Sequence, residues 1–218
     1  MRTKVLRGAL ALTLALAFAG LALADDFLPP AFRGDPLTVM AEWDFVQDFM
    51  PDPMNVLPEN LVTVGDGIHQ FSGPGTHAHV SDTVFWEVDP NDPNDGRAFT
   101  LDLPGQIDFF VMNWIDEYEF KHIWVQITYG GQGRPTVSGV IAPPWDNPFN
   151  GIFQFAIEVD PNHRVEYWLL IPNPVSEHIY LELPPFTWVD QVVIDTISTP
   201  EPVQTESRTW SDVKTLFE

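Results

Sequence analysis

Oxygen-bearing side chains are concentrated in one short segment, residues 89–95. They are Asp89, Asn91, Asp92, Asn94 and Asp95. Carboxylate and carboxamide oxygens are typical ligands of Ca²⁺, and a bound cation would relieve repulsion in an acidic chain. The spacing does not follow the EF-hand pattern, and the same residue types are preferred in turns. The segment therefore predicts either a calcium site or a solvated turn.

Two histidines, His77 and His79, form a His-x-His pattern. In an extended segment, alternate side chains point the same way, so both imidazoles would lie on one face. Such a pair could hold a transition metal with an acid such as Asp82 as the third ligand. The alternative is that both are ordinary surface or hydrogen-bonded histidines.

Aromatic side chains give a third signal, on residues 123–129. Ile123, Val125 and Ile127 share one face of the expected strand and leave Trp124, Gln126 and Thr128 on the other. A tryptophan beside amide and hydroxyl groups suits a sugar, because the ring contacts CH groups while the polar groups bind hydroxyls. Trp145, in a proline-rich loop, is a fourth candidate ligand-binding residue. The alternative is that these indoles fill a second layer of the core.

Catalytic patterns are weaker. The sequence contains no Gly-x-Ser-x-Gly elbow, phosphate-binding loop or dinucleotide-binding fingerprint. Its 31 Asp and Glu residues make chance pairs of carboxylates inevitable, so counting cannot nominate a hydrolase pair. We therefore expect no catalytic residues, and a secreted hydrolase is the third reading of the function.

The elements that would position these residues are short strands. From residue 61 onward, brief apolar alternations are separated by Pro, Gly, Asn and Asp turns, with almost no helical periodicity. About eight or nine strands predict a single all-β domain, an antiparallel, jelly-roll-like β-sandwich, over residues 61–200. Residues 25–60 are expected to form an extended lead-in with loops. Residues 201–218 form a polar tail, which is either frayed or a short helix with an apolar stripe.

Charge excludes one class of partner. The 218 residues contain 10 Lys and Arg against 31 Asp and Glu, a formal net charge of −21. A nucleic acid backbone would be repelled by such a chain, so we expect no nucleic acid partner. The chain has no cysteine, which excludes disulfides, thiolate metal sites and cysteine nucleophiles.

Residues 1–24 have the features of a secretory signal peptide. Three early cations precede an apolar run, and the small-x-small pattern Ala22-Leu23-Ala24 would be the cleavage site. No later stretch is long and apolar enough to span a membrane. The sequence thus predicts a secreted protein, extracellular or at the cell surface, with no transmembrane segment in the mature chain.

Three short motifs resemble uncharacterised secreted PEP-CTERM-type proteins of planctomycete-like and other environmental bacteria. They are Phe32-Arg33-Gly34 with Glu42-Trp43-Asp44-Phe45, Glu166-Tyr167-Trp168 with Pro172-Asn173-Pro174, and the final strand at residues 189–196 followed by Pro200-Glu201-Pro202. The resemblance implies secretion and a β-rich fold. It implies no activity, and residues 203–218 lack the membrane helix and basic tail of a PEP-CTERM signal.

Together these patterns predict a secreted, non-enzymatic β-sandwich that binds an extracellular polymer, most plausibly a polysaccharide, with calcium as the candidate structural ion. The alternative is a structural or matrix protein of the cell surface that binds other surface proteins or further copies of itself. An exposed Trp124 would favour the first reading.

Overall fold

The computed structural model describes residues 26–46, 56–73, 75–89, 92–146 and 148–201, with the backbone alone for residues 89 and 92–95. The predicted signal peptide and most of the polar tail therefore lie outside the described residues. Within the described chain, no helix has the length and hydropathy of a membrane span.

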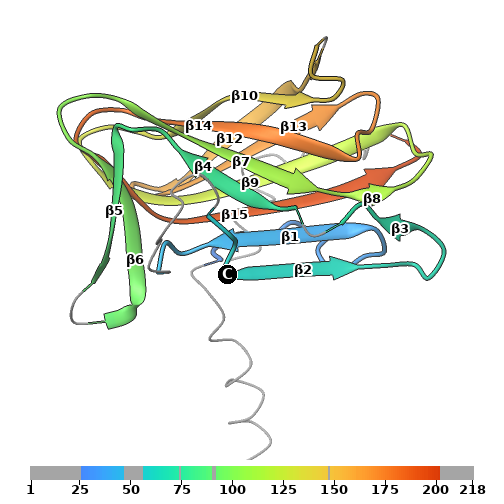
Figure 1. The fold of residues 1–218 in the computed structure, drawn as a ribbon, viewed down its shortest axis with the longest axis horizontal. Coiled ribbons are helices and arrows are strands. Elements are labelled where there is room, and N and C mark those ends of the chain that lie inside the picture. The colour runs from blue at the N-terminus through green and yellow to red at the C-terminus, as the bar shows by residue number, and fades with distance from the viewer. Residues whose placement is uncertain (1–25, 47–55, 74, 90–91, 147, 202–218) are drawn as a thin grey trace, which may run out of the picture.

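The larger sheet, sheet A, contains eight strands. In spatial order its main path is β12 (Ile152–Asp160), β13 (His163–Leu170), β9 (Phe120–Gly131), β15 (Thr187–Thr199), β1 (Thr38–Trp43) and β2 (Asn60–Val64). A hairpin of β5 (Val84–Asp89) and β6 (Asp92–Thr100) joins β15 through β6. Figure 1 shows this hairpin at one end of the molecule, running across the direction of the other strands.

The smaller sheet, sheet B, contains five strands. Their order is β11 (Phe149–Asn150), β10 (Thr136–Ala142), β14 (Ser176–Leu183), β7 (Gly105–Met112) and β4 (His77–Val80). A separate two-stranded sheet pairs β3 (Gln70–Phe71) with β8 (Trp114–Ile115). All pairings between the described strands are antiparallel, and the predicted antiparallel β-sandwich is confirmed.

The core lies between sheets A and B. Val125 and Ile127 of β9 and Ile179 and Leu181 of β14 belong to this core, and all four side chains are fully buried. This arrangement follows from the alternation of the sequence, since every second residue of a strand points to the same face. The rings of Trp43 on β1 and Phe109 on β7 lie 4.7 Å apart and connect the two layers.

The sandwich begins earlier than the sequence indicates. The lead-in was expected to be extended chain with loops up to residue 60, but residues 38–43 form β1, a strand between β15 and β2. Val39, Ala41 and Trp43 of this strand are fully buried. The alternation in β1 is short and is bordered by Pro36 and by the proline-rich segment after residue 50, so its local pattern resembles a loop.

Residues 26–33, here called the N-terminal strap, cover the outer face of sheet A. The backbone N–H of Leu28 donates to Gln126 Oε1 at 2.8 Å, and the Trp124 indole N–H donates to the Leu28 carbonyl at 3.0 Å. Arg33 donates to both carboxylate oxygens of Asp195 on β15, at 2.6 and 2.5 Å. The strap therefore lies against the centre of sheet A through side-chain contacts.

Candidate binding face

The outer surface of sheet B carries a row of three ring-bearing residues and one isoleucine. Successive cross-strand neighbours are Ile141 on β10, His178 on β14, Phe110 on β7 and His77 on β4. Their sequence neighbours point into the core, so this row points outward. The ring centroids of Phe110 lie 4.8 Å from His178 and 5.2 Å from His77. Four adjacent strands thus build one partly exposed row.

A second row runs beside the first and is more polar. Its cross-strand neighbours are Gly139 on β10, Tyr180 on β14, Asp108 on β7 and His79 on β4. A Cβ atom at Gly139 would meet only the Tyr180 ring, at 3.9 Å, so the surface beside Tyr180 is open. We call the two rows, together with Trp145, the sheet B face.

Trp145 completes this face from the loop between β10 and β11. Its indole is 49% exposed and meets the His178 ring edge to face at 4.7 Å and 88°. The Phe110 ring lies 6.4 Å away. A loop residue therefore lies over the two strand residues at the centre of the first row, where its apolar surface remains available.

The polar side chains of the sheet B face are held by hydrogen bonds to neighbouring groups. Asp108 accepts from His178 Nδ1 through both oxygens at 2.9 Å, and the Gly75 carbonyl accepts from His77 Nδ1. The Gly75 carbonyl has no hydrogen to donate, so Nδ1 of His77 carries the hydrogen of that bond and Nε2 of the neutral ring is an acceptor. Burial and the charge of Asp108 raise the pKa of the Tyr180 hydroxyl, which stays a donor.

This combination of groups is chemically suited to a sugar and contains no lysine or arginine to attract an anion. Aromatic rings supply apolar surface for CH groups, while the hydroxyl, carboxylate and imidazole nitrogens can hydrogen-bond to sugar hydroxyls. Among the described residues no lysine or arginine belongs to the face, because Arg33, Arg97, Arg134 and Arg164 pair with carboxylates elsewhere and Lys121 is buried.

The other predicted ligand-binding residues lie on the opposite side of the molecule. Trp124, Gln126 and Thr128 point away from the core, as their strand pattern indicates, but they lie on the outer face of sheet A. Gln126 is 1% exposed and Thr128 is 7% exposed. Trp124 is half-buried between the strap and the rings of Tyr167 and Phe155, at 6.2 and 6.0 Å. The structure therefore does not join these three residues to Trp145.

The structure describes some of the predicted metal ligands and leaves others outside the described residues. His77 and His79 do lie on one face of β4, which is the sheet B face, and Asp82 follows that strand in an exposed turn. The described residues contain no group of three His, Asp or Glu side chains arranged to hold a metal ion. The side chains of residues 89–95 are outside the described residues, so a calcium site there stays a prediction.

Sequence reasoning missed most of the sheet B face. Phe110, His178, Tyr180 and Asp108 were not among the candidates, although their strands had been recognised. The usable signal was the alternation of inward and outward residues along β7. Ile107, Phe109 and Val111 mark its inner face, so Asp108 and Phe110 must point outward. A large aromatic residue in an outward position should have been noted.

Comparison with known proteins adds no identification. No protein-family model matches the chain, and no curated protein matches it in sequence.

Proposed function

We propose that this protein is a secreted, non-enzymatic β-sandwich that binds an uncharged extracellular polysaccharide on the sheet B face. The observation that carries the proposal is the half-exposed Trp145 indole packed on His178 and Phe110, with Tyr180 and Asp108 in the adjoining row. Rings beside fixed hydrogen-bonding groups suit a polymer of sugar units, and a row that crosses four strands suits a long chain.

The charge of the face supports an uncharged ligand. Asp108 is a carboxylate within the face, and Glu182 lies exposed two residues beyond Tyr180 on the same strand. A polymer of uronic acids would meet these negative groups without a cation to bind, since the described arginines pair with carboxylates elsewhere and Lys121 is buried. A neutral polymer carries no charge for these carboxylates to repel, so they do not weaken its binding.

The test is retention of the purified protein on a panel of insoluble neutral and acidic polysaccharides. Trp145→Ala should weaken retention about tenfold or more, because a central aromatic contact is lost. Phe153→Ala is a matched control, because Phe153 is 48% exposed but lies on β12 of the other sheet. Trp124→Phe tests the sequence-based candidate and should leave retention unchanged.

Calcium and EDTA arms separate the predicted roles further. Retention that disappears in EDTA would assign a role to residues 89–95, whereas retention unaffected by EDTA places binding on the sheet B face alone. No retention of the wild-type protein on any polymer would contradict the proposal.

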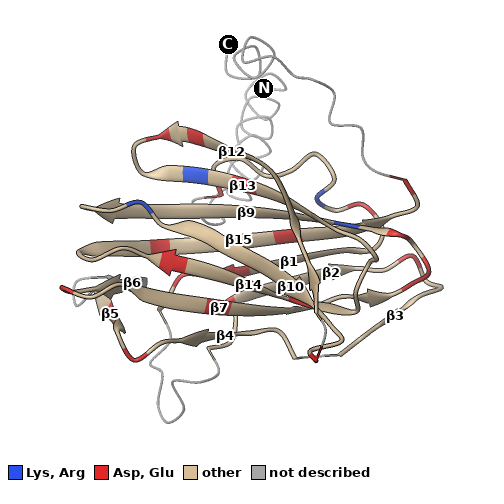
Figure 2. Ribbon diagram, turned by 90° about the horizontal axis from the view of Figure 1, so that it is seen from above, with Lys and Arg blue, Asp and Glu red and all other residues tan. Residues whose placement is uncertain are grey.

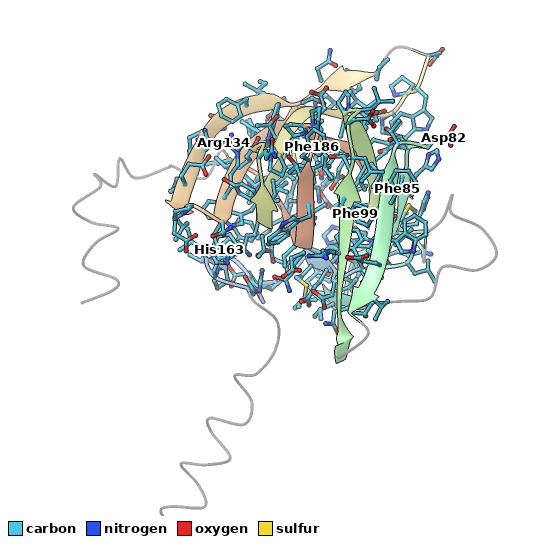
Figure 3. All side chains as sticks on the ribbon, turned by 90° about the vertical axis from the view of Figure 1, so that its left-hand side faces the viewer. Asp82, Phe85, Phe99, Arg134, His163 and Phe186 are labelled. Carbon is cyan, nitrogen blue, oxygen red and sulfur yellow. The ribbon has the colours of Figure 1, made fainter. Side chains whose placement is uncertain are left out.

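The second candidate function is self-association at a cell surface. Exposed apolar side chains at the end of the molecule near the β5–β6 hairpin favour it. Phe85 is 46% exposed and its ring lies 5.8 Å from Phe99, while Leu101 and Phe186 are about half exposed at 51% and 50%. The Phe186 N–H donates to the Leu101 carbonyl, so these apolar side chains share one end (Figure 3). Sedimentation of the wild-type protein and of Phe85→Ala over a range of concentrations would detect association through this end.

A further inference from the structure

Three chemically reactive side chains meet inside the sandwich at one end. Lys121 is the second residue of β9 in sheet A, Glu177 lies on β14 in sheet B, and Asn113 directly follows β7. All three are fully buried. Each continues the inward-facing series of its strand: Lys121 precedes Ile123, Glu177 precedes Ile179, and Asn113 follows Val111. The two sheets therefore direct an amine, a carboxyl group and a carboxamide into one interior space.

The side-chain amide of Asn113 is held between two groups that would activate it. Its Nδ2 donates to the Glu177 carboxyl group, and its Oδ1 accepts from Thr196 Oγ1 at 2.8 Å. The backbone is also fixed, because the Asn113 N–H donates to the Val175 carbonyl at 3.0 Å. A donor on the carbonyl oxygen stabilises the oxyanion formed by nucleophilic attack, and an acid at nitrogen assists departure of the amine.

The Lys121 amine reaches the same part of β15. Its Nζ donates to Ser198 Oγ at 2.7 Å, two residues after Thr196. Residues two apart on a strand point to the same face and lie about 7 Å apart along it. The amine and the carboxamide therefore contact neighbouring inward positions of one strand.

The interior also favours the reactive protonation states. Burial lowers the pKa of Lys121, and burial raises the pKa of Glu177. A neutral amine is the nucleophilic form of lysine, and a protonated carboxyl group can donate to a leaving amine. The second carboxyl oxygen of Glu177, Oε1, is buried and has no hydrogen-bond partner among the described residues.

We propose that Lys121 and Asn113 form an intramolecular isopeptide bond, with Glu177 transferring the proton. The bond between Lys121 Nζ and Asn113 Cγ forms, and the bond between Asn113 Cγ and Nδ2 breaks. Glu177 receives a proton from the attacking amine and gives one to the departing nitrogen, which leaves as ammonia. The reaction needs no oxidant and no cofactor, and it releases one ammonia per chain.

The product would join the two sheets covalently. It would link the start of β9 in sheet A to the end of β7 in sheet B across residues 114–120. The sequence contains no cysteine, so a disulfide cannot serve this purpose. An exported protein would thereby gain a cross-link that reducing agents do not break.

Intact-mass spectrometry of the denatured protein, purified after expression of the full chain, tests the proposal. We expect a mass lower by one ammonia than the sequence of the processed chain requires. We also expect a proteolytic fragment in which Lys121 and Asn113 are joined and Lys121 resists trypsin. The full sequence mass would overturn the proposal.

Two other reactions must be distinguished. Asn150-Gly151 could lose ammonia by closing to a succinimide, so the fragment spectrum must place the link on Lys121 and Asn113. The carboxyl group of Asp116 also acts electrostatically on Lys121, and a link to it would release water instead. Either result in place of the Lys121–Asn113 link would overturn the assignment.

Variants separate the chemistry from the packing. Lys121→Arg and Asn113→Ala should have the full sequence mass, and Glu177→Gln should reduce the cross-linked fraction at least tenfold. Asn173→Ala is the matched control, because Asn173 is a second carboxamide of the same network, bonded to Asp116 at 2.7 Å and to Ser198 at 3.4 Å. It should retain the cross-link. Full cross-linking in Glu177→Gln would remove Glu177 from the mechanism.

Discussion

Arg33 is the cation on which the buried carboxylate of Asp195 depends. Asp195 is 1% exposed on β15, and burial raises the pKa of its carboxyl group while hydrogen bonds from Arg33 oppose that shift. Arg33 also pairs with Asp26 of the strap. One guanidinium group therefore holds both ends of the strap to each other and to sheet A.

Replacing Arg33 with alanine should reduce the free energy of unfolding by about 3 kcal/mol, because the buried carboxylate of Asp195 would lose its counter-charge and keep the hydrogen bond with Gln126. The double variant Arg33→Ala with Asp195→Asn should recover part of this loss, since a carboxamide needs no counter-charge. Urea unfolding measures both. A loss below about 0.5 kcal/mol in the single variant would show that the pair is not needed.

His122 should make stability depend on pH. Burial, with a smaller contribution from the charge of Lys121, lowers its pKa to about 4, and its ring bonds Tyr167 and Thr199. The folded pKa lies below the unfolded value of about 6.5, so below that pH the unfolded chain binds a proton that the folded chain does not. The stabilisation due to the neutral ring is therefore lost as the pH falls from about 6.5 to about 4.

Between about pH 7 and about pH 4.5, the wild-type protein should lose about 2 kcal/mol more stability than His122→Gln, which cannot titrate. Urea unfolding of both proteins at the two pH values gives the difference. Equal losses of stability in the two proteins would mean that His122 is protonated in the folded state at about pH 4.5, which would contradict a lowered pKa.

At the residue level, the direction of a side chain was easier to predict than its exposure. The alternation of β9 placed Trp124 and Gln126 outside the core, which is where they lie. It could not show that residues 26–33, about a hundred positions earlier, cover Gln126. Exposure depends on contacts between distant segments, whereas direction depends only on the period of the strand.

At the level of elements, the hairpin of β5 and β6 is joined to the body by a close backbone approach. A Cβ atom at Gly96 on β6 would overlap the carbonyl group of Phe45, a residue just after β1 with a φ of +54°. Only glycine allows these two backbones to lie so close together. Gly96 therefore sets where the hairpin leaves the sandwich.

Gly96→Ala should lower the free energy of unfolding by about 2 kcal/mol, because the backbone must shift to admit the methyl group. Gly139→Ala is the control, since a Cβ atom there meets only the Tyr180 ring at 3.9 Å. Its stability should stay close to that of the wild type. Thermal unfolding of the two variants would reveal the contrast, and similar stabilities would rule out a tight contact at Gly96.

The strands after residue 61 could be predicted because their alternations are separated by clear turn residues. Residues 123–129 and 179–183 are examples, and both are strands of the core. β1 was missed because six residues between proline-rich segments give a weak periodic signal. The pairing of β1 with β15, over 150 positions away, gives it a central place that no local pattern contains.

The whole molecule presents mainly negative charge to its surroundings. Figure 2 shows few lysine and arginine positions among many aspartates and glutamates. The described cations interact with carboxylates of the same chain, as Arg164 does with Glu158 and Glu166. Attraction of an acidic polymer would therefore require added cations.

Retention on a neutral polysaccharide should change little between low and high salt, because the contacts proposed for the sheet B face are rings and hydrogen bonds rather than ion pairs. Acidic polysaccharides should not be retained in either condition. Affinity measurements at two ionic strengths test this, and binding that is strong at low salt and lost at high salt would point to an ionic contact. Glu182→Lys should gain some binding to an acidic polymer.

The position of β15 has a consequence for the export that we propose for this protein. β15 is the last described strand, yet it pairs with β9, β1 and β6 at the centre of sheet A. Until residues 187–199 have been synthesised, β1 and β9 lack the strand that lies between them. The pairing of β15 with β1 also joins segments that are separated by most of the chain. An incomplete chain should therefore remain unfolded, which is the form that export through a translocation channel would require. In an exported protein the sheet would close only after the last strand had crossed.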